Sequence, residues 1–102
     1  MDLSKKEFIK AKILFKLARK EIYGGKHLSL DLLKHGFKGP ETGEVDSAAE
    51  ELIKQGWLLV KPAHYGKQVM INLNYSKEIK EFIRKVLGNL PPFSEMLKWM
   101  KF

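Results

Sequence analysis

SAAEELIKQGWLLVKPAHYGKQVMINLN, residues 47–74, is the stretch that decides the fold of this chain. It opens with Ser47 and, three residues later, Glu50. This is the spacing of a capping box, in which the hydroxyl and the carboxylate each accept a hydrogen bond from a free backbone N–H at a helix start. Gly56 can then end the helix by adopting the left-handed conformation. The stretch predicts a short helix that runs to Gln55 and leads directly into extended chain.

The extended chain reads as a β-hairpin. Residues 57–61 are aromatic and branched, and residues 67–73 place Val, Ile and Leu at every second position, which is the strand period. Between them, residues 62–66 (PAHYG) contain the Pro and Gly of a turn. We therefore expect two antiparallel strands that are joined at an exposed tip.

Helical periodicity and capping residues predict further helices on both sides of this stretch. The predicted ranges are residues 4–23, closed by Gly24 and Gly25; residues 29–35, capped by Ser29; residues 76–87; and a short helix in the apolar C-terminal tail. The start of the helix that ends at Gln55 has two alternatives. Pro40 can occupy its first position, since Pro is favoured there, or a loop can run on to the capping box at Ser47.

The order of these elements, helix, helix, helix, hairpin, helix, resembles the winged helix-turn-helix DNA-binding domains of small prokaryotic-type regulators over residues 5–75. The phrase LIKQGWL, residues 52–58, is similar to the L-x-x-x-G-x-L exit from a recognition helix into the wing. The resemblance implies an α+β, mainly α fold, with a three-helix core, a C-terminal β-hairpin wing and additional C-terminal helices. It assigns residues 1–88 to the winged-helix domain and residues 89–102 to a tail that packs on the domain or on a partner.

Composition narrows the classes of function. A chain of 102 residues with 44% hydrophobic residues forms one domain with a core. It has no cysteine and no apolar run long enough to span a membrane, and its N-terminus lacks a signal-peptide core, so we expect a cytoplasmic protein with no membrane partner. The richness in Lys and the scarcity of Gln and Asn are typical of heat-adapted proteins.

Enzyme and metal motifs are not found in the sequence. The triplet Gly24-Gly25-Lys26 lacks the spacing of a phosphate-binding loop and follows a helix instead of opening one. The three histidines, His27, His35 and His64, are dispersed and have no cysteine beside them to complete a zinc site. We predict no catalysis, no cofactor and no metal.

The charge pattern favours a polyanionic partner. The net charge is +7, and ten Lys and Arg stand against four acids in residues 1–40, nine against three in residues 52–102. Three groups of side chains are candidates for phosphate contacts: a stripe on the first helix, residues around the second helix, and the tip of the wing. The candidate residues are Lys5, Lys12, Lys16 and Arg19; Lys34 and Lys38; and Lys61, His64, Tyr65 and Lys67.

An acidic segment interrupts this basic chain. Residues 41–51 carry five acids and no base, and they include the start of the helix that the resemblance assigns to the DNA groove. Carboxylates repel phosphates, and among the base edges only the amino group of cytosine favours them. This departure argues against ordinary major-groove readout and predicts binding mainly through phosphates.

A second apolar ridge on the first helix needs a cover, which is either the C-terminal tail or another subunit. The residues assigned to this interface are Ile9, Ile13, Leu17, Phe93, Met96, Leu97 and Met100. Terminal-helix pairing in regulators of this build favours a homodimer.

Two hypotheses follow from these features. The first is a protein that binds double-stranded DNA and regulates transcription. The second is an adaptor or assembly subunit that binds proteins through its apolar surfaces and not DNA. RNA binding is a smaller third option.

Overall fold

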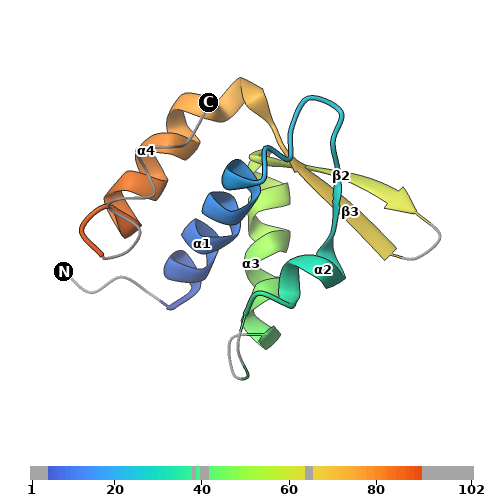
Figure 1. Ribbon diagram of the computed structural model, residues 1–102, viewed down its shortest axis with the longest axis horizontal. Coiled ribbons are helices and arrows are strands. Elements are labelled where there is room, and N and C mark those ends of the chain that lie inside the picture. Colours follow the sequence, from blue (N-terminus) through green and yellow to red (C-terminus); the bar gives the residue numbers. More distant parts are fainter. Residues whose placement is uncertain (1–4, 38, 40–41, 64–65, 91–102) are drawn as a thin grey trace.

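The computed structural model describes residues 5–37, 39, 42–63 and 66–90, with the backbone alone described at residues 62 and 63. It has a mainly helical α+β fold with an antiparallel sheet, as the sequence predicts (Figure 1). In chain order the described elements are α1 (Lys5–Arg19), β1 (Leu28–Ser29), α2 (Leu30–Lys34), α3 (Thr42–Gln55), β2 (Leu58–Ala63), β3 (Gly66–Ile71), the 3-10 turn η2 (Leu73–Tyr75) and α4 (Ser76–Leu87).

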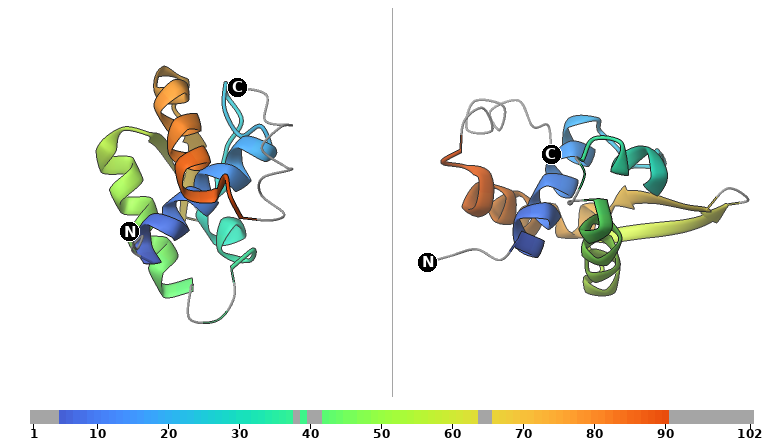
Figure 2. Two further views of the ribbon diagram at one scale, coloured as in Figure 1. Left: turned by 90° about the vertical axis from the view of Figure 1, so that its left-hand side faces the viewer. Right: turned by 90° about the horizontal axis from the view of Figure 1, so that it is seen from below.

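Helix α1 lies at the centre of the molecule. It packs against α3 on one side and α4 on the other, and the hairpin of β2 and β3 projects away from this helical layer (Figures 1 and 2). Seven residues of α1 are buried and all of them are apolar. A helix with apolar residues nearly all round is a core helix, and α1 fits that description.

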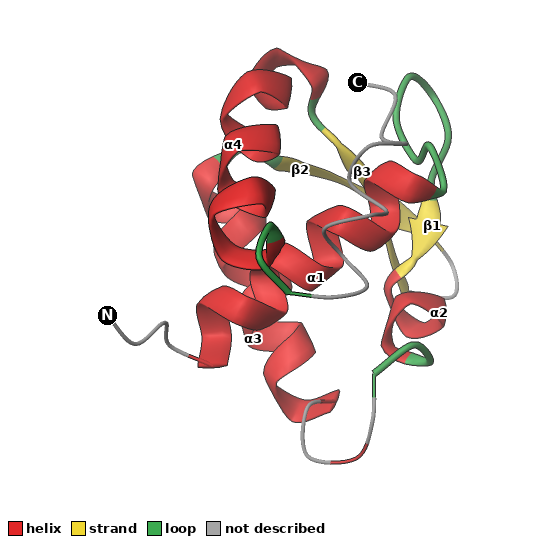
Figure 3. Ribbon diagram, turned by 60° about the vertical axis from the view of Figure 1, so that its left-hand side comes forward, coloured by secondary structure: helices red, strands yellow, loops and turns green. Residues whose placement is uncertain are grey.

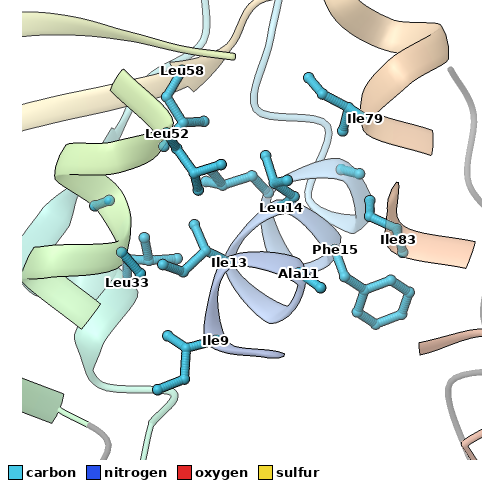
Figure 4. Packing of buried hydrophobic residues seen from close by; sticks show 14 of the residues in the cluster. Ile9, Ala11, Ile13, Leu14, Phe15, Leu33, Leu52, Leu58, Ile79 and Ile83 are labelled. Carbon is cyan, nitrogen blue, oxygen red and sulfur yellow. The ribbon is translucent and has the colours of Figure 1, made fainter. Parts of the chain in front are cut away.

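The second ridge of α1 is therefore part of the core, and its assignment to an interface is wrong. Ile9, Ile13 and Leu17 have no exposed surface. Ile13 points toward Leu33 of α2 and Leu52 of α3, and Ile9 lies below Ile13 in the view (Figure 4). The cover that this ridge needs thus comes from helices of the same chain. The remaining interface residues, Phe93, Met96, Leu97 and Met100, lie outside the described residues.

The C-terminus of α1 differs from the prediction. The helix ends at Arg19, four residues early, and Glu21 rather than a glycine has the left-handed conformation, with φ 57°. The N–H of Ile22 donates to the carbonyl of Leu17, and that of Glu21 donates to Ala18. This is the Schellman arrangement. Gly24 and Gly25 also have positive φ, but they shape the loop after the helix.

The N-terminus of α3 corrects the prediction of a capping box. The helix begins at Thr42, so of the two alternatives the early start, near Pro40, is right. Ser47 and Glu50 lie within the helix and are exposed. Their Ser-x-x-Glu spacing also occurs between neighbouring turns on one helix face, where it caps nothing. The C-terminus is as predicted: Gly56 has φ 84°, and Trp57 N–H donates to the carbonyl of Leu52.

The sheet has the strand order β1-β3-β2, and both pairings are antiparallel. The predicted hairpin is confirmed, with Leu58 opposite Ile71, but its strands extend into the predicted turn, because Pro62 pairs with Lys67 and Ala63 with Gly66. Strand β1 was not predicted; it pairs Leu28 with Val69 and runs directly into α2 (Figure 3). Just before β1, the carbonyl of Ile22 accepts a hydrogen bond from Ile71 N–H at 2.9 Å.

Strand β2 is an edge strand, and its sequence suits that position. Asn72 N–H donates to the carbonyl of Trp57, which fixes the ladder so that every second residue from Trp57 bonds to β3. Residues 58, 60 and 62 therefore direct their backbone groups away from β3. Pro62 has no N–H to offer there, so this edge is a poor template for another strand.

Helix α4 has the predicted bounds. Ile79 and Ile83 are fully buried and face α1 (Figure 4). Phe82 is partly buried and meets Trp57 edge to face, with the ring centroids 5.6 Å apart. Aromatic pairs in this geometry contribute about 0.5–1.5 kcal/mol beyond their buried area. The contact joins α4 to the base of the hairpin.

Candidate nucleic-acid interface

Those predicted basic residues that the structure describes do not form one continuous free surface. Lys38, His64 and Tyr65 lie outside the described residues. Lys5, Arg19 and Lys61 are exposed and make no ion pair with a described carboxylate. Lys5 and Arg19 are the first and last residues of α1, about 21 Å apart at 1.5 Å per residue, so they do not form a local cluster.

Lys12 has a structural role in α1. Its Nζ lies 5.2 Å from the ring centroid of Phe8 and 5.0 Å from that of Phe37, close enough for a cation–π interaction with each. Phe37 itself is buried. Lys12 therefore holds the segment after α2 against α1.

Lys16 also connects these two segments. Its Nζ donates to the carbonyl of Leu33 at 3.3 Å, near the C-terminal end of α2, where a cation is favoured. A Cβ at Gly36 would lie 1.8 Å from this Nζ, so the absence of a side chain there leaves room for the lysine. Partial burial lowers the pKa of Lys16, and nearby Lys20 lowers it further. Neither Lys12 nor Lys16 is a free phosphate ligand.

Lys34 and Lys67 are both paired with acids of α3. Lys34, from α2, lies 2.8 Å from Asp46, whose hydrogen bond raises the pKa of this lysine. Lys67, from β3, donates to Glu50 at 2.6 Å, and this bond holds the pKa of the Glu50 carboxyl below its usual value. The acidic segment thus pairs with two of the lysines that were predicted to contact phosphates.

A third acid of α3, Glu51, faces α1. Glu51 accepts from Lys6 at 2.6 Å and lies 3.6 Å from Lys10, both on α1, and the hydrogen bond from Lys6 lowers the pKa of Glu51. Neither lysine was among the residues predicted from the sequence to be functional. Their separation of four residues places them on one face of α1, and this spacing could have predicted that both contact the same acid.

We define the α3 charged face as Lys34, Asp46, Glu50, Lys54 and Lys67. These groups are close enough to interact, because Asp46 raises and Lys54 lowers the pKa of Glu50 besides the larger effect of Lys67. Ser47 is exposed on the same helix. The three cations and two carboxylates give this face a net charge of +1.

Apolar side chains are also exposed on the hairpin. Leu59 is 45% and Val60 41% exposed, both on the edge strand β2. Leu59 lies opposite Met70 on the sheet face that Leu58 and Ile71 do not occupy. Leu59 and Met70 form an apolar strip on this face, beside the charged residues of the hairpin, whereas Val60 points to the opposite face.

Among the described residues no three or more His, Asp and Glu side chains gather closely enough to hold a metal ion. None of the described helices is long and apolar enough to cross a membrane.

Comparison of the chain with protein-family models, with curated proteins and with solved structures finds no match.

Proposed function

We propose that this chain is a winged helix-turn-helix domain that binds double-stranded DNA and regulates transcription, with α3 at the groove and the β2–β3 hairpin along the phosphate backbone. The element order, with a short β1 before α2 and a sheet of order β1-β3-β2, supports this fold. The net charge of +7 supports an anionic partner.

One observation carries the proposal. Helix α3 packs on α1 through four small or aliphatic residues and leaves an exposed polar side beside the hairpin. Its exposed side chains include Ser47, Glu50 and Lys54. A helix held from behind with its polar side open is the arrangement by which helix-turn-helix proteins enter a groove.

The state of the lysines limits the strength of this binding. Lys54 and Lys61 are exposed and have no ion pair with a described carboxylate, whereas Lys34 and Lys67 are paired. Each phosphate contact contributes about −0.9 to the slope of log affinity against log salt concentration. Two contacts from the unpaired lysines give a slope of about −2, which is typical of weak binding with little sequence preference.

The test is the binding of a labelled random duplex, followed by fluorescence anisotropy over a series of salt concentrations. The double variant Lys54→Ala/Lys61→Ala should weaken binding and flatten the salt slope by about 2. The matched control is Lys77→Ala/Lys85→Ala, which removes the same charge from α4, on the far side of α1 from α3. Absence of binding at low salt would overturn the proposal, as would equal losses in both double variants.

A protein-binding adaptor is the second candidate. The exposed Leu59 and Val60 favour it, because apolar side chains on a hairpin are common in protein interfaces. A homodimer stays a prediction. Because the second ridge of α1 is buried, the contact between subunits would involve the tail or this strip. Light scattering of the wild type and of Leu59→Ser distinguishes the cases: a dimer lost in the variant supports the strip as an interface.

A further inference from the structure

The two ion pairs on the α3 charged face hold lysines that lie beside the proposed DNA-binding side of α3. Lys67 belongs to the hairpin and Lys34 to α2, two elements whose lysines both reach acids of α3. We infer that Glu50 and Asp46 are internal competitors for phosphate: each occupies a lysine, and DNA binds fully only when its phosphates replace these carboxylates. This inference rests on the proposed function and concerns the regulation of the same site.

Exposure makes such an exchange possible. Side-chain exposure is 51% for Lys67 and 48% for Glu50, and 28% for Lys34 and 55% for Asp46. Ion pairs open to solvent are weak and readily broken, whereas buried pairs are not. A DNA backbone that approaches α3 can therefore reach both ammonium groups without unpacking the core.

Charge sets the direction of the effect. With both carboxylates ionised the α3 charged face carries +1, and without them it carries +3. Carboxylates are ionised at neutral pH, and the hydrogen bond from Lys67 lowers the pKa of Glu50 further. A phosphate that reaches Lys67 must displace this carboxylate and remain near its negative charge, so the acids lower the affinity.

A positioning role for the same pairs makes the opposite prediction. If the Lys67–Glu50 contact serves to hold the hairpin against α3 in the orientation that DNA requires, removal of the carboxylate loosens the hairpin and weakens binding. Competition predicts tighter binding after the same substitution. The two roles are thus separated by the sign of one measurement.

The experiment measures the affinity of wild type, Glu50→Gln, Asp46→Asn and the double variant for the labelled random duplex at low salt. Each single variant should bind about two- to fivefold more tightly and the double variant about tenfold, the range in which exposed ion pairs act. The matched control is Glu81→Gln on α4. It raises the net charge equally, and Glu81 has no ion pair with a described lysine, so its affinity should stay close to that of wild type.

A second comparison ties the gain to the lysine. In the Lys67→Ala background, Glu50→Gln should no longer tighten binding, because the side chain that it releases is absent. Thermal melts followed by circular dichroism verify that each variant is folded. Persistence of the gain without Lys67 would overturn the inference.

The outcomes distinguish a failure of this inference from a failure of the proposed function. Wild-type binding that Glu50→Gln weakens or leaves unchanged overturns the inference alone, as does an equal gain from Glu81→Gln. Failure of the wild type and of every variant to bind duplex DNA overturns the proposed function, and the inference falls with it.

Discussion

Helices α1 and α3 lie side by side and have nearly the same length, 15 and 14 residues, but they meet solvent differently. In α1 seven residues are buried, and even Lys12 and Lys16 contact neighbouring segments of the same chain. In α3 four residues are buried, and the opposite side carries charged groups. Helix α1 therefore contributes mainly to stability, whereas α3 presents a charged side to solvent.

The largest effect is expected from Leu14→Ala, in the middle of α1. Leu14 has no exposed surface and lies among Leu52 of α3 and Ile79 of α4 (Figure 4). The cavity should lower the free energy of unfolding by about 2–5 kcal/mol, measured by urea denaturation. Ser47→Ala, on the exposed side of α3, should change it by less than about 0.5 kcal/mol. Similar values for the two variants would remove the distinction between the helices.

The ends of the two helices allow a finer comparison, because both use the Schellman arrangement. Gly56→Ala in α3 should lower the free energy of unfolding by about 1–2 kcal/mol, since a side chain disfavours the left-handed backbone. A Cβ there would lie at ordinary contact distance, 3.5 Å, from the Tyr75 ring, so the cost comes from the backbone. Urea denaturation measures it, and an unchanged midpoint would contradict the assignment.

Glu21→Gly, at the corresponding position of α1, should have the opposite sign. Glycine adopts φ 57° without strain, so the variant should gain about 0.5 kcal/mol after the greater flexibility of its unfolded chain is allowed for. The same denaturation series measures it. A loss of stability would show that contacts of the Glu21 side chain outweigh the backbone strain.

The smallest effect concerns the acids of α3. The pKa values of Glu50 and Glu51 are lowered in the folded chain by their hydrogen bonds to Lys67 and Lys6. Because the folded value lies below the unfolded one, the stabilisation is present above about pH 4.5 and is lost as the pH falls further. Thermal melts between pH 6 and 3 should show this decrease, and Glu50→Gln/Glu51→Gln should reduce it. The control Glu78→Gln/Glu81→Gln, on α4, should not.

Local signals in the sequence predicted the elements whose structure depends on neighbouring residues. The bounds of α4, the left-handed Gly56 and the pairing of the hairpin follow from apolar period, glycine chemistry and strand alternation. Strand β1 was not predicted, because a strand of two residues shows no periodicity. Its residues are extended because they pair with β3. The left-handed conformation of Glu21 was not predicted, because glycine is the residue expected after the last turn of a helix.

The candidate interface was harder to predict, because charges pair through tertiary contacts. Lys67 and Glu50 are 17 residues apart, and their contact depends on how the hairpin returns over α3. The sequence located the basic groups and the acidic segment separately. It also placed the ridge of Ile9 and Ile13 on a surface, because a helical pattern gives the faces of a helix but not how many neighbours cover them.

The loop at residues 23–27 offers an entry point for engineering. Its two ends are anchored to the same strand, by the bond from Ile71 to the Ile22 carbonyl and by the pairing of Leu28 with Val69. Between them Gly24 and Gly25 are exposed, and a Cβ on either would meet nothing within 4 Å. Doubling such a loop costs only about 0.6 kcal/mol in closure entropy. A fluorophore or an affinity tag can therefore be spliced in here while α3 and the hairpin keep their native scaffold.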